Sequence, residues 1–283
     1  MGFLFSMSEF QALFLGILQG ITEFLPISSS GHLIVVPRLF AWEPGGLTFD
    51  IAVHVGSLCA VIFFFRKRLF FLLQNCLTQG IGGKKARGLL IRIFVGILPA
   101  ALVGFFFKNF FEEWVRTPFV VVASLIVWGV VLWIVDIWAH RQEQESSEHL
   151  VNQAENDFST ISFFKILCIG VAQVIALVPG TSRSGITLIA GLASKLSKKQ
   201  AVEFSFLMSI PLILGAAVLR FYDVFQAGGS QIEFGPLVFG VLGAFFSGFL
   251  ALKLLWKMAE SYRFWPFALY RIVLGLGLLM FFL

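Results

Sequence analysis

Long apolar segments, separated by short polar ones, run along the whole chain. A helix needs about 20 apolar residues to cross the hydrocarbon core of a membrane. Six segments are long enough to predict transmembrane helices: residues 49–65, 89–107, 118–138, 201–219, 237–258 and 264–283. Because such segments recur from one end of the sequence to the other, we expect one membrane domain and no separate soluble domain.

Two more apolar segments are shorter and carry polar residues. Residues 10–25 contain Gln19 and Glu23 and stop at a proline, and residues 161–178 likewise stop at a proline. Each is followed by a turn rich in serine and glycine and then by a second short apolar piece, at residues 33–40 and 186–194. This pattern predicts two re-entrant helical hairpins. Irregular backbone at membrane depth has to be covered by protein or line a wet cavity, so the hairpin tips indicate a site.

Basic residues predict the orientation of the spans. Lysine and arginine concentrate at residues 66–88, 195–199 and 253–263, which all fall on one side of the predicted topology. Because basic loops stay in the cytoplasm, we expect that side to be cytoplasmic, together with the acidic loop at 139–160. The first hairpin then enters from the periplasmic face and the second from the cytoplasmic face.

The sequence carries signs of an internal repeat. A shift of 153 residues places Pro26 and Ser29 of the first turn on Pro179 and Ser182 of the second. Each half holds one hairpin and three spans, and an odd number of crossings inverts the second copy. We therefore expect an all-α polytopic membrane protein built as an inverted repeat. The predicted halves are residues 8–138 and 161–283, joined by the loop at 139–160.

Composition agrees with a membrane protein. Hydrophobic residues make up 58% of the 283 residues. Charged residues make up 13%, against roughly 25% in soluble domains. The formal net charge of +5 is explained by the basic loops that orient the spans, so nucleic acid is not implied as a partner.

The first turn carries a carboxylate, hydroxyls and an imidazole in the stretch "EFLPISSSGH". Gln19 and Glu23 are four residues apart and share one helix face. A carboxylate within a membrane is a functional hypothesis by default, although a hydrated glutamate at the interface is the alternative. Three hydroxyls follow, on Ser28, Ser29 and Ser30. A serine needs a base to become a nucleophile, and His32 can supply one.

The second turn, "PGTSRSG", places Arg183 among hydroxyls. A guanidinium surrounded by hydroxyls and exposed amides at the start of a helix suits a phosphate oxyanion. The alternative is that Arg183 only pairs with Glu23 or Glu203. Together the two turns predict a phosphoryl-transfer site made of carboxylate, hydroxyl nucleophile, imidazole and arginine. Asp50 and Glu203 either line the same cavity or cap a helix at the interface, and the sequence assigns no role to the Tyr270 and Arg271 pair.

At this point a resemblance becomes visible. "QGITEFLPISSSGH" and "PGTSRSG" resemble the two signatures of the undecaprenyl-diphosphate phosphatase family, the bacitracin-resistance phosphatases of bacterial membranes. "EFSFLMSIP" and "PFALYR" extend the likeness over the whole chain. The resemblance implies removal of the terminal phosphate of undecaprenyl diphosphate, which regenerates the lipid carrier for peptidoglycan synthesis. It also implies a divalent cation, Mg²⁺ or Ca²⁺, an inner-membrane location with the site open to the periplasm, and a homodimer among membrane lipids.

The same resemblance implies roles for individual residues. Ser29 and His32 match the nucleophile and its partner, Arg183 matches the phosphate-binding group, and Glu23 is the principal metal ligand. Gln19 stands where many members have glutamate, so a metal site with two carboxylates is in doubt. Substrate-binding roles fall on the remaining polar residues: Gln19, Ser28, Ser30, Thr181, Ser182, Ser184 and Thr187. A phosphoserine intermediate and direct attack by water both stay open.

Two other functions compete with this interpretation. Type-2 lipid phosphatases use similar elements, but their Lys-x6-Arg-Pro element is absent and Ile189 stands where they need a histidine. A polyprenyl-phosphate flippase or transporter is the second alternative, because inverted repeats with broken helices are typical of transporters.

Overall fold

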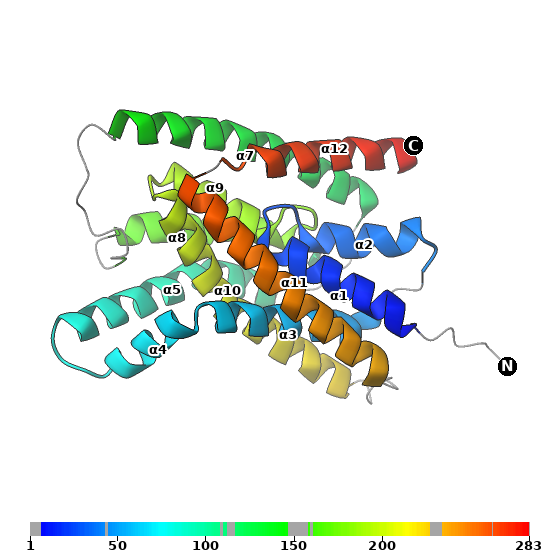
Figure 1. Cartoon of the computed structure of the whole chain (residues 1–283), viewed down its shortest axis with the longest axis horizontal. Coiled ribbons are helices and arrows are strands. Elements are labelled where there is room, and N and C mark those ends of the chain that lie inside the picture. The colour runs from blue at the N-terminus through cyan, green and yellow to red at the C-terminus, as the bar shows by residue number, and fades with distance from the viewer. Residues whose placement is uncertain are drawn as a thin grey trace.

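The computed structural model describes residues 7–42, 45–107, 110–111, 117–146, 158, 161–226, 234–261 and 263–282. These residues form helices and the turns between them, with no strand, so the all-α prediction is confirmed for the part described. The first six helices are α1 (Glu9–Phe24), α2 (Ser29–Leu39), α3 (Gly46–Phe64), α4 (Arg66–Asn75), α5 (Ile81–Phe106) and α7 (Pro118–Ser146). The later ones are α8 (Phe163–Val174), α9 (Arg183–Ala193), α10 (Lys198–Gln226), α11 (Phe234–Ser261) and α12 (Trp265–Phe282), with a 3₁₀ turn at Ile175–Leu177 (Figure 1).

The chain is a multi-pass membrane protein. Five helices of the described residues are long and apolar enough to cross a membrane, namely α5, α7, α10, α11 and α12. The predicted span at 49–65 corresponds to α3, which passes the same test only together with α4. The pair is bent by 71° at the break between them. Arg66, Lys67 and Arg68 begin α4, and charged side chains resist entry into hydrocarbon, which explains why the apolar helix ends there.

The two predicted hairpins are present as pairs of short helices. α2 and α9 have 11 residues each. At a rise of about 1.5 Å per residue, such a helix spans roughly half of a hydrocarbon core about 30 Å thick. α1 ends where Leu25 adopts an extended conformation before Pro26, and α8 ends in the 3₁₀ turn that precedes Pro179. The lengths therefore suit helices that enter a membrane without crossing it.

Small residues let the first hairpin pack closely on α11. A Cβ atom at Gly20 would meet Ser247, Ala244 and Gly248, and one at Gly16 would meet the backbone of Gly240. Such small residues, four apart, allow helices in a membrane to approach backbone to backbone. Figure 1 shows α1 lying beside α11.

The second hairpin makes the corresponding contact on α5. A Cβ atom at Gly170 of α8 would lie 2.6 Å from the carbonyl oxygen of Gly96. Each hairpin thus packs on a span that belongs to the other half of the chain. This exchange favours the inverted repeat, which stays a prediction. Most of the joining loop predicted at 139–160 lies outside the described residues, and α7 itself continues to Ser146.

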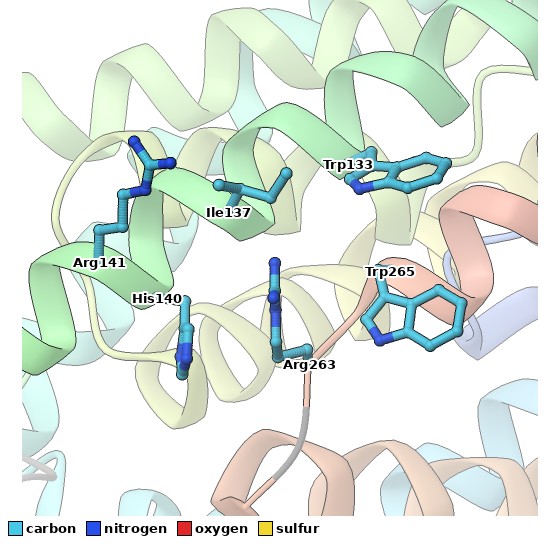
Figure 2. Close-up of a pocket in the computed structure, with 6 residues that line it drawn as sticks. All are labelled: Trp133, Ile137, His140, Arg141, Arg263 and Trp265. Atoms are coloured by element: carbon cyan, nitrogen blue, oxygen red, sulfur yellow. The ribbon is translucent and has the colours of Figure 1, made fainter.

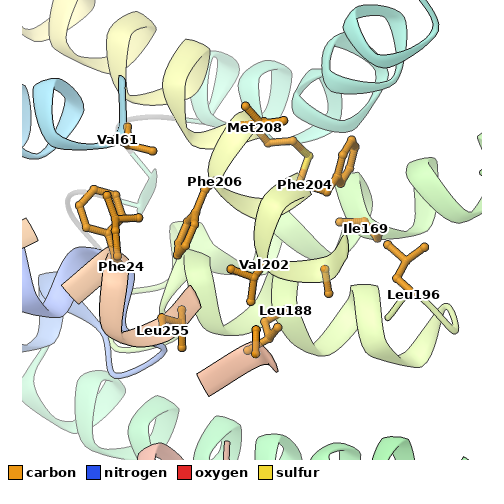
Figure 3. Packing of buried hydrophobic residues seen from close by; sticks show 14 of the residues in the cluster. Phe24, Val61, Ile169, Leu188, Leu196, Val202, Phe204, Phe206, Met208 and Leu255 are labelled. Atoms are coloured by element: carbon orange, nitrogen blue, oxygen red, sulfur yellow. The ribbon is translucent and has the colours of Figure 1, made fainter. Parts of the chain in front are cut away.

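The hydrophobic core holds the end of α1 against α10. Phe24 is fully buried, and its ring meets that of Phe206 edge to face with 5.5 Å between the ring centroids. Val202, Phe204 and Met208 of α10 belong to the same cluster (Figure 3). Because Glu23 directly precedes Phe24, this packing fixes the position of its carboxylate.

Candidate functional site

Each hairpin tip is a tight turn built on a serine. Ser28 and Ser182 have φ angles of 77° and 73°, in the left-handed region that residues other than glycine rarely adopt. Each serine side chain accepts a hydrogen bond from the main-chain N–H three residues later, Gly31 in α2 and Gly185 in α9. The two tips therefore share one strained conformation and one helix cap. Such strain persists only where the surroundings enforce it.

The two tips lie against each other. The hydroxyl of Ser184 donates to the carbonyl oxygen of Leu25 over 3.1 Å. The main-chain N–H of Gly180 donates to the hydroxyl of Ser30 over 3.4 Å. Segments about 150 residues apart in the sequence are thus joined directly, and the polar groups of both predicted half-sites share one location.

Arg271 of α12 joins the two tips through hydrogen bonds to their carbonyl oxygens. Its side chain is fully buried, and a guanidinium carries five N–H donors in a planar fork. It donates to five carbonyl oxygens, those of Pro26 (3.3 Å), Ser124 (3.3 Å), Leu125 (3.5 Å), Gly180 (2.9 Å) and Thr181 (2.8 Å). Irregular turns leave carbonyls without helical partners, so one side chain satisfies both tips and the neighbouring α7.

Glu23 is the centre of the polar cluster. Its carboxylate is buried and accepts hydrogen bonds at both oxygens. Arg183 lies 3.2 Å from Oε1, while Ser29 (2.7 Å) and Gln19 (3.1 Å) donate to Oε2. The imidazole Nε2 of His54 lies 3.8 Å from the same Oε2. The structure therefore brings together the predicted carboxylate, serine and arginine, and it pairs Arg183 with Glu23 rather than with Glu203.

Several of the predicted substrate-binding hydroxyls already have partners inside the tips. Ser28 and Ser182 cap helices, Ser184 joins the two tips, and Thr187 donates to the carbonyl oxygen of Arg183 over 2.8 Å. By contrast, Oε1 of Gln19 and Oγ1 of Thr181 are buried without a hydrogen-bond partner. An unpaired buried acceptor or hydroxyl is costly, so these two atoms are suited to receive a ligand.

His32 does not pair with Ser29 as the sequence predicted. No hydrogen bond between the two is present among the described contacts. The ring of His32 instead lies with Nδ1 2.6 Å from the carbonyl oxygen of Ser28 and Nε2 2.7 Å from the hydroxyl of Tyr270. Ser29 turns toward Glu23, so the carboxylate and not the imidazole is the acceptor for its proton in this structure.

Four residues of the site received no role from the sequence: His54, Ser205, Tyr270 and Arg271. Ser205 accepts from Arg183 with its carbonyl oxygen, at 3.2 Å, and its hydroxyl lies 2.6 Å from that of Thr187. Tyr270 and Arg271 were visible as polar residues at an otherwise apolar span, which is a signal for function, but their partners became known only in three dimensions. Glu203, considered as a partner for Arg183, pairs with Arg68 over 3.0 Å.

The described residues offer a hard cation few ligands. They contain no group of three or more histidine, cysteine, aspartate or glutamate side chains placed to hold a metal ion. Carboxylate, amide and hydroxyl oxygens of Glu23, Gln19 and Ser29 are nevertheless the donors that Mg²⁺ and Ca²⁺ prefer. The unpartnered Oε1 of Gln19 agrees with that donor set. Remaining ligands would have to come from water or from a bound phosphate.

A separate cavity of about 600 Å³ lies between α7 and α12 and the residues that precede α12. It is lined by Trp133, Ile137, His140, Arg141, Arg263 and Trp265 (Figure 2). None of these is a predicted site residue. Tryptophan together with arginine is typical of positions where helices leave a membrane.

Comparisons with known proteins point to one family. The family model described as bacitracin resistance protein BacA matches residues 12–277. The undecaprenyl-diphosphatase of Alteromonas mediterranea is 40% identical over 277 residues, which cover 97% of this chain and 99% of the relative. Undecaprenyl-diphosphatase 2 of Stutzerimonas stutzeri is 38% identical, covering 98% and 99%, and the undecaprenyl-diphosphatase of Chromohalobacter salexigens is 38% identical, covering 94% and 96%.

Replacing Arg271 by lysine should destabilise the joined tips. An ammonium group cannot serve five carbonyl oxygens in different directions, and we expect a loss of about 3 kcal/mol from the carbonyls left unpaired. The midpoint of thermal unfolding of the purified protein should fall by several degrees. Arg66→Lys is the control, because exposed Arg66 donates to a single carbonyl oxygen, that of Phe63. Equal midpoints for the two variants would contradict the role of Arg271.

Proposed function

Because the chain belongs to the bacitracin resistance protein BacA family, we propose that it hydrolyses undecaprenyl diphosphate to undecaprenyl phosphate and inorganic phosphate. The reaction recycles the lipid carrier of peptidoglycan synthesis. One observation of the structure carries the proposal: Ser29 and Arg183, from different hairpins, bind opposite oxygens of the Glu23 carboxylate. The relatives named above bear the name of the hydrolase and none that of a transporter, so the flippase alternative receives no support.

Arg183 is the proposed anchor of the terminal phosphate. Among the described contacts only two of its nitrogen atoms are used, Nη2 for Glu23 and Nη1 for the carbonyl oxygen of Ser205. A guanidinium has five N–H donors, so it can bind a phosphate without releasing the carboxylate. Arg183 is also the first residue of α9, and main-chain amides at a helix start attract the same anion. Thr181 completes the proposed binding surface with its unpartnered hydroxyl, which can donate to the phosphate.

Ser29 is the proposed nucleophile and Glu23 its base. As the hydroxyl oxygen of Ser29 attacks the terminal phosphorus, its proton passes to Oε2 of Glu23, which already accepts it at 2.7 Å. The bond between that phosphorus and the bridging oxygen breaks, and undecaprenyl phosphate leaves with the bridging oxygen. Water then hydrolyses the phosphoserine, and Glu23 returns the proton. Direct attack by water, with Glu23 as base, is the alternative that leaves no covalent intermediate.

A divalent cation, Mg²⁺ or Ca²⁺, belongs to the proposal. Glu23 is its proposed principal ligand, with oxygen atoms of Gln19 and Ser29 beside it. When bound, such an ion supplies positive charge to the phosphate oxygens, which is the main requirement of phosphoryl transfer. Arg183 supplies the remaining charge from the other hairpin.

We place this function in the bacterial inner membrane, with the site open to the periplasm. Resemblance to the family supports both features, and the basic residues assigned to the cytoplasmic side support the orientation of the spans. The long apolar tail of the substrate would lie among membrane lipids against the outer faces of the helices, where large apolar side chains such as Phe246 and Leu250 of α11 are exposed. A homodimer is part of the same proposal.

The purified protein in detergent should release inorganic phosphate from undecaprenyl diphosphate. EDTA should stop the release and added Mg²⁺ or Ca²⁺ should restore it, since the cation offsets charge that Arg183 alone does not. Phosphate is measured colorimetrically, with heat-denatured protein as the control. Undiminished release in EDTA would contradict the cation, and no release under any condition would contradict the hydrolase.

Ser29→Ala distinguishes the two routes of hydrolysis. For the covalent route we expect at least about a thousandfold loss of turnover, because the attacking atom is gone. Substrate labelled with ³²P in its terminal phosphate should also transfer label to Ser29 upon rapid acid quench. Ser197→Ala is a suitable control, because this exposed serine lies outside the site and caps α10. Full activity of Ser29→Ala would eliminate the covalent route and leave direct attack by water.

A further inference from the structure

Tyr270 touches the site, but no step of the proposed reaction uses it. Its hydroxyl oxygen lies 2.7 Å from Nε2 of His32, and the two rings are nearly parallel, with 7° between their planes. The other ring nitrogen of His32, Nδ1, lies 2.6 Å from the carbonyl oxygen of Ser28. Both nitrogen atoms of this buried imidazole are therefore engaged.

These partners determine where the proton of a neutral His32 resides. A carbonyl oxygen can only accept, so Nδ1 has to carry the proton that it shares with Ser28. The second nitrogen of a neutral imidazole is then an acceptor, and Nε2 takes the O–H of Tyr270. The Ser28 carbonyl thus selects the tautomer, and the tyrosine hydroxyl, which can donate or accept, adopts the donor role at Nε2 and holds the ring in place.

The second hairpin shows what this imidazole adds to the first. At the second tip the carbonyl oxygen of Ser182 accepts the main-chain N–H of Ile186 at 2.9 Å. At the first tip the equivalent main-chain bond, from His32 to Ser28, is longer at 3.3 Å, and the imidazole supplies the short contact instead. A tip can therefore form without histidine, but the first one relies on the ring to hold its serine carbonyl.

We propose that Tyr270 is a positioning residue that acts through His32 on Ser29. By donating to Nε2 it keeps the imidazole oriented so that Nδ1–H holds the Ser28 carbonyl, and the next residue, Ser29, is thereby presented to Glu23. Without the tyrosine hydroxyl Nε2 loses this partner, and the ring can turn away from the Ser28 carbonyl. The consequence for turnover rests on the proposed function, whereas the orientation of the ring does not.

Nitrogen-15 NMR of the histidine side chains tests the tautomer directly. The protein has four histidines, and His32→Asn assigns the signals of His32 by their disappearance. We expect a protonated Nδ1 and an unprotonated, hydrogen-bonded Nε2, and in Tyr270→Phe a shifted Nε2 signal together with a weaker Nδ1–H hydrogen bond. A protonated Nε2 in the unsubstituted neutral protein, or unchanged signals of both nitrogen atoms in Tyr270→Phe, would overturn the proposal. The spectra need no substrate.

Kinetics test the consequence for Ser29. Tyr270→Phe should lower kcat about fivefold, the effect of one ordinary hydrogen bond, with little change in KM. Tyr222→Phe is the matched control, because exposed Tyr222 lies on α10 and its hydroxyl accepts only from Gln226 among the described contacts.

A double variant separates positioning from other effects. Asparagine carries a permanent N–H donor close to the place of Nδ1 but no atom at the place of Nε2, so Tyr270→Phe should change nothing further in a His32→Asn background. The same fivefold loss in both backgrounds would overturn the inference, because Tyr270 would then act independently of His32. Absence of phosphate release by the unsubstituted protein would instead contradict the proposed function, and the spectra would still decide the tautomer.

Discussion

Main-chain polar groups inside a membrane have no water to bond, and this constraint shapes the rest of the protein. Two chain reversals occur within or beside the apolar layers, and each exposes carbonyls and amides that no helix satisfies. The side chains of Ser28 and Ser182 accept hydrogen bonds from exposed amides, and the buried guanidinium of Arg271 donates to exposed carbonyls. Because Arg271 joins the tips to each other, it also brings the acidic end of one hairpin to the basic end of the other.

The polar cluster is a consequence of that junction. A buried carboxylate needs a positive partner and hydrogen-bond donors, and Glu23 finds them on the other hairpin, on α2 and on its own helix. The same pair leaves donors of Arg183 free for a further anion. A structural salt bridge and a phosphate-binding site are therefore compatible here, since the guanidinium fork has more donors than the carboxylate uses.

Much of the architecture was predictable from the sequence, and the limits are instructive. The lengths of the apolar segments predicted the spans, and a proline followed by serine and glycine predicted both tips. Both signals depend only on residues that are close together in the sequence. The break between α3 and α4 could be read in the same way from three consecutive basic residues. The residue types of the site were also recognisable, since Glu23 and Arg183 are anomalous in their apolar surroundings.

The hydrogen-bond partners within the site were not predictable from the sequence. Sequence spacing suggested a bond between Ser29 and His32, but Ser29 bonds to Glu23, and His32 bonds to Tyr270 of the distant α12. Arg183 of the second hairpin binds the other oxygen of the Glu23 carboxylate, and Tyr270 of the last span binds the imidazole. The role of Arg271 was not predictable for the same reason, because all five of its acceptors lie on other helices and turns.

The most direct test is a double-mutant cycle of Glu23→Gln and Arg183→Gln, with phosphate release from undecaprenyl diphosphate as the readout. If the two side chains form one site, each single change should cost about a hundredfold or more, and the double variant should be at most about tenfold worse than the poorer single one. Losses that multiply fully in the double variant would mean that the two groups act independently, and that result would contradict a shared site at the joined tips.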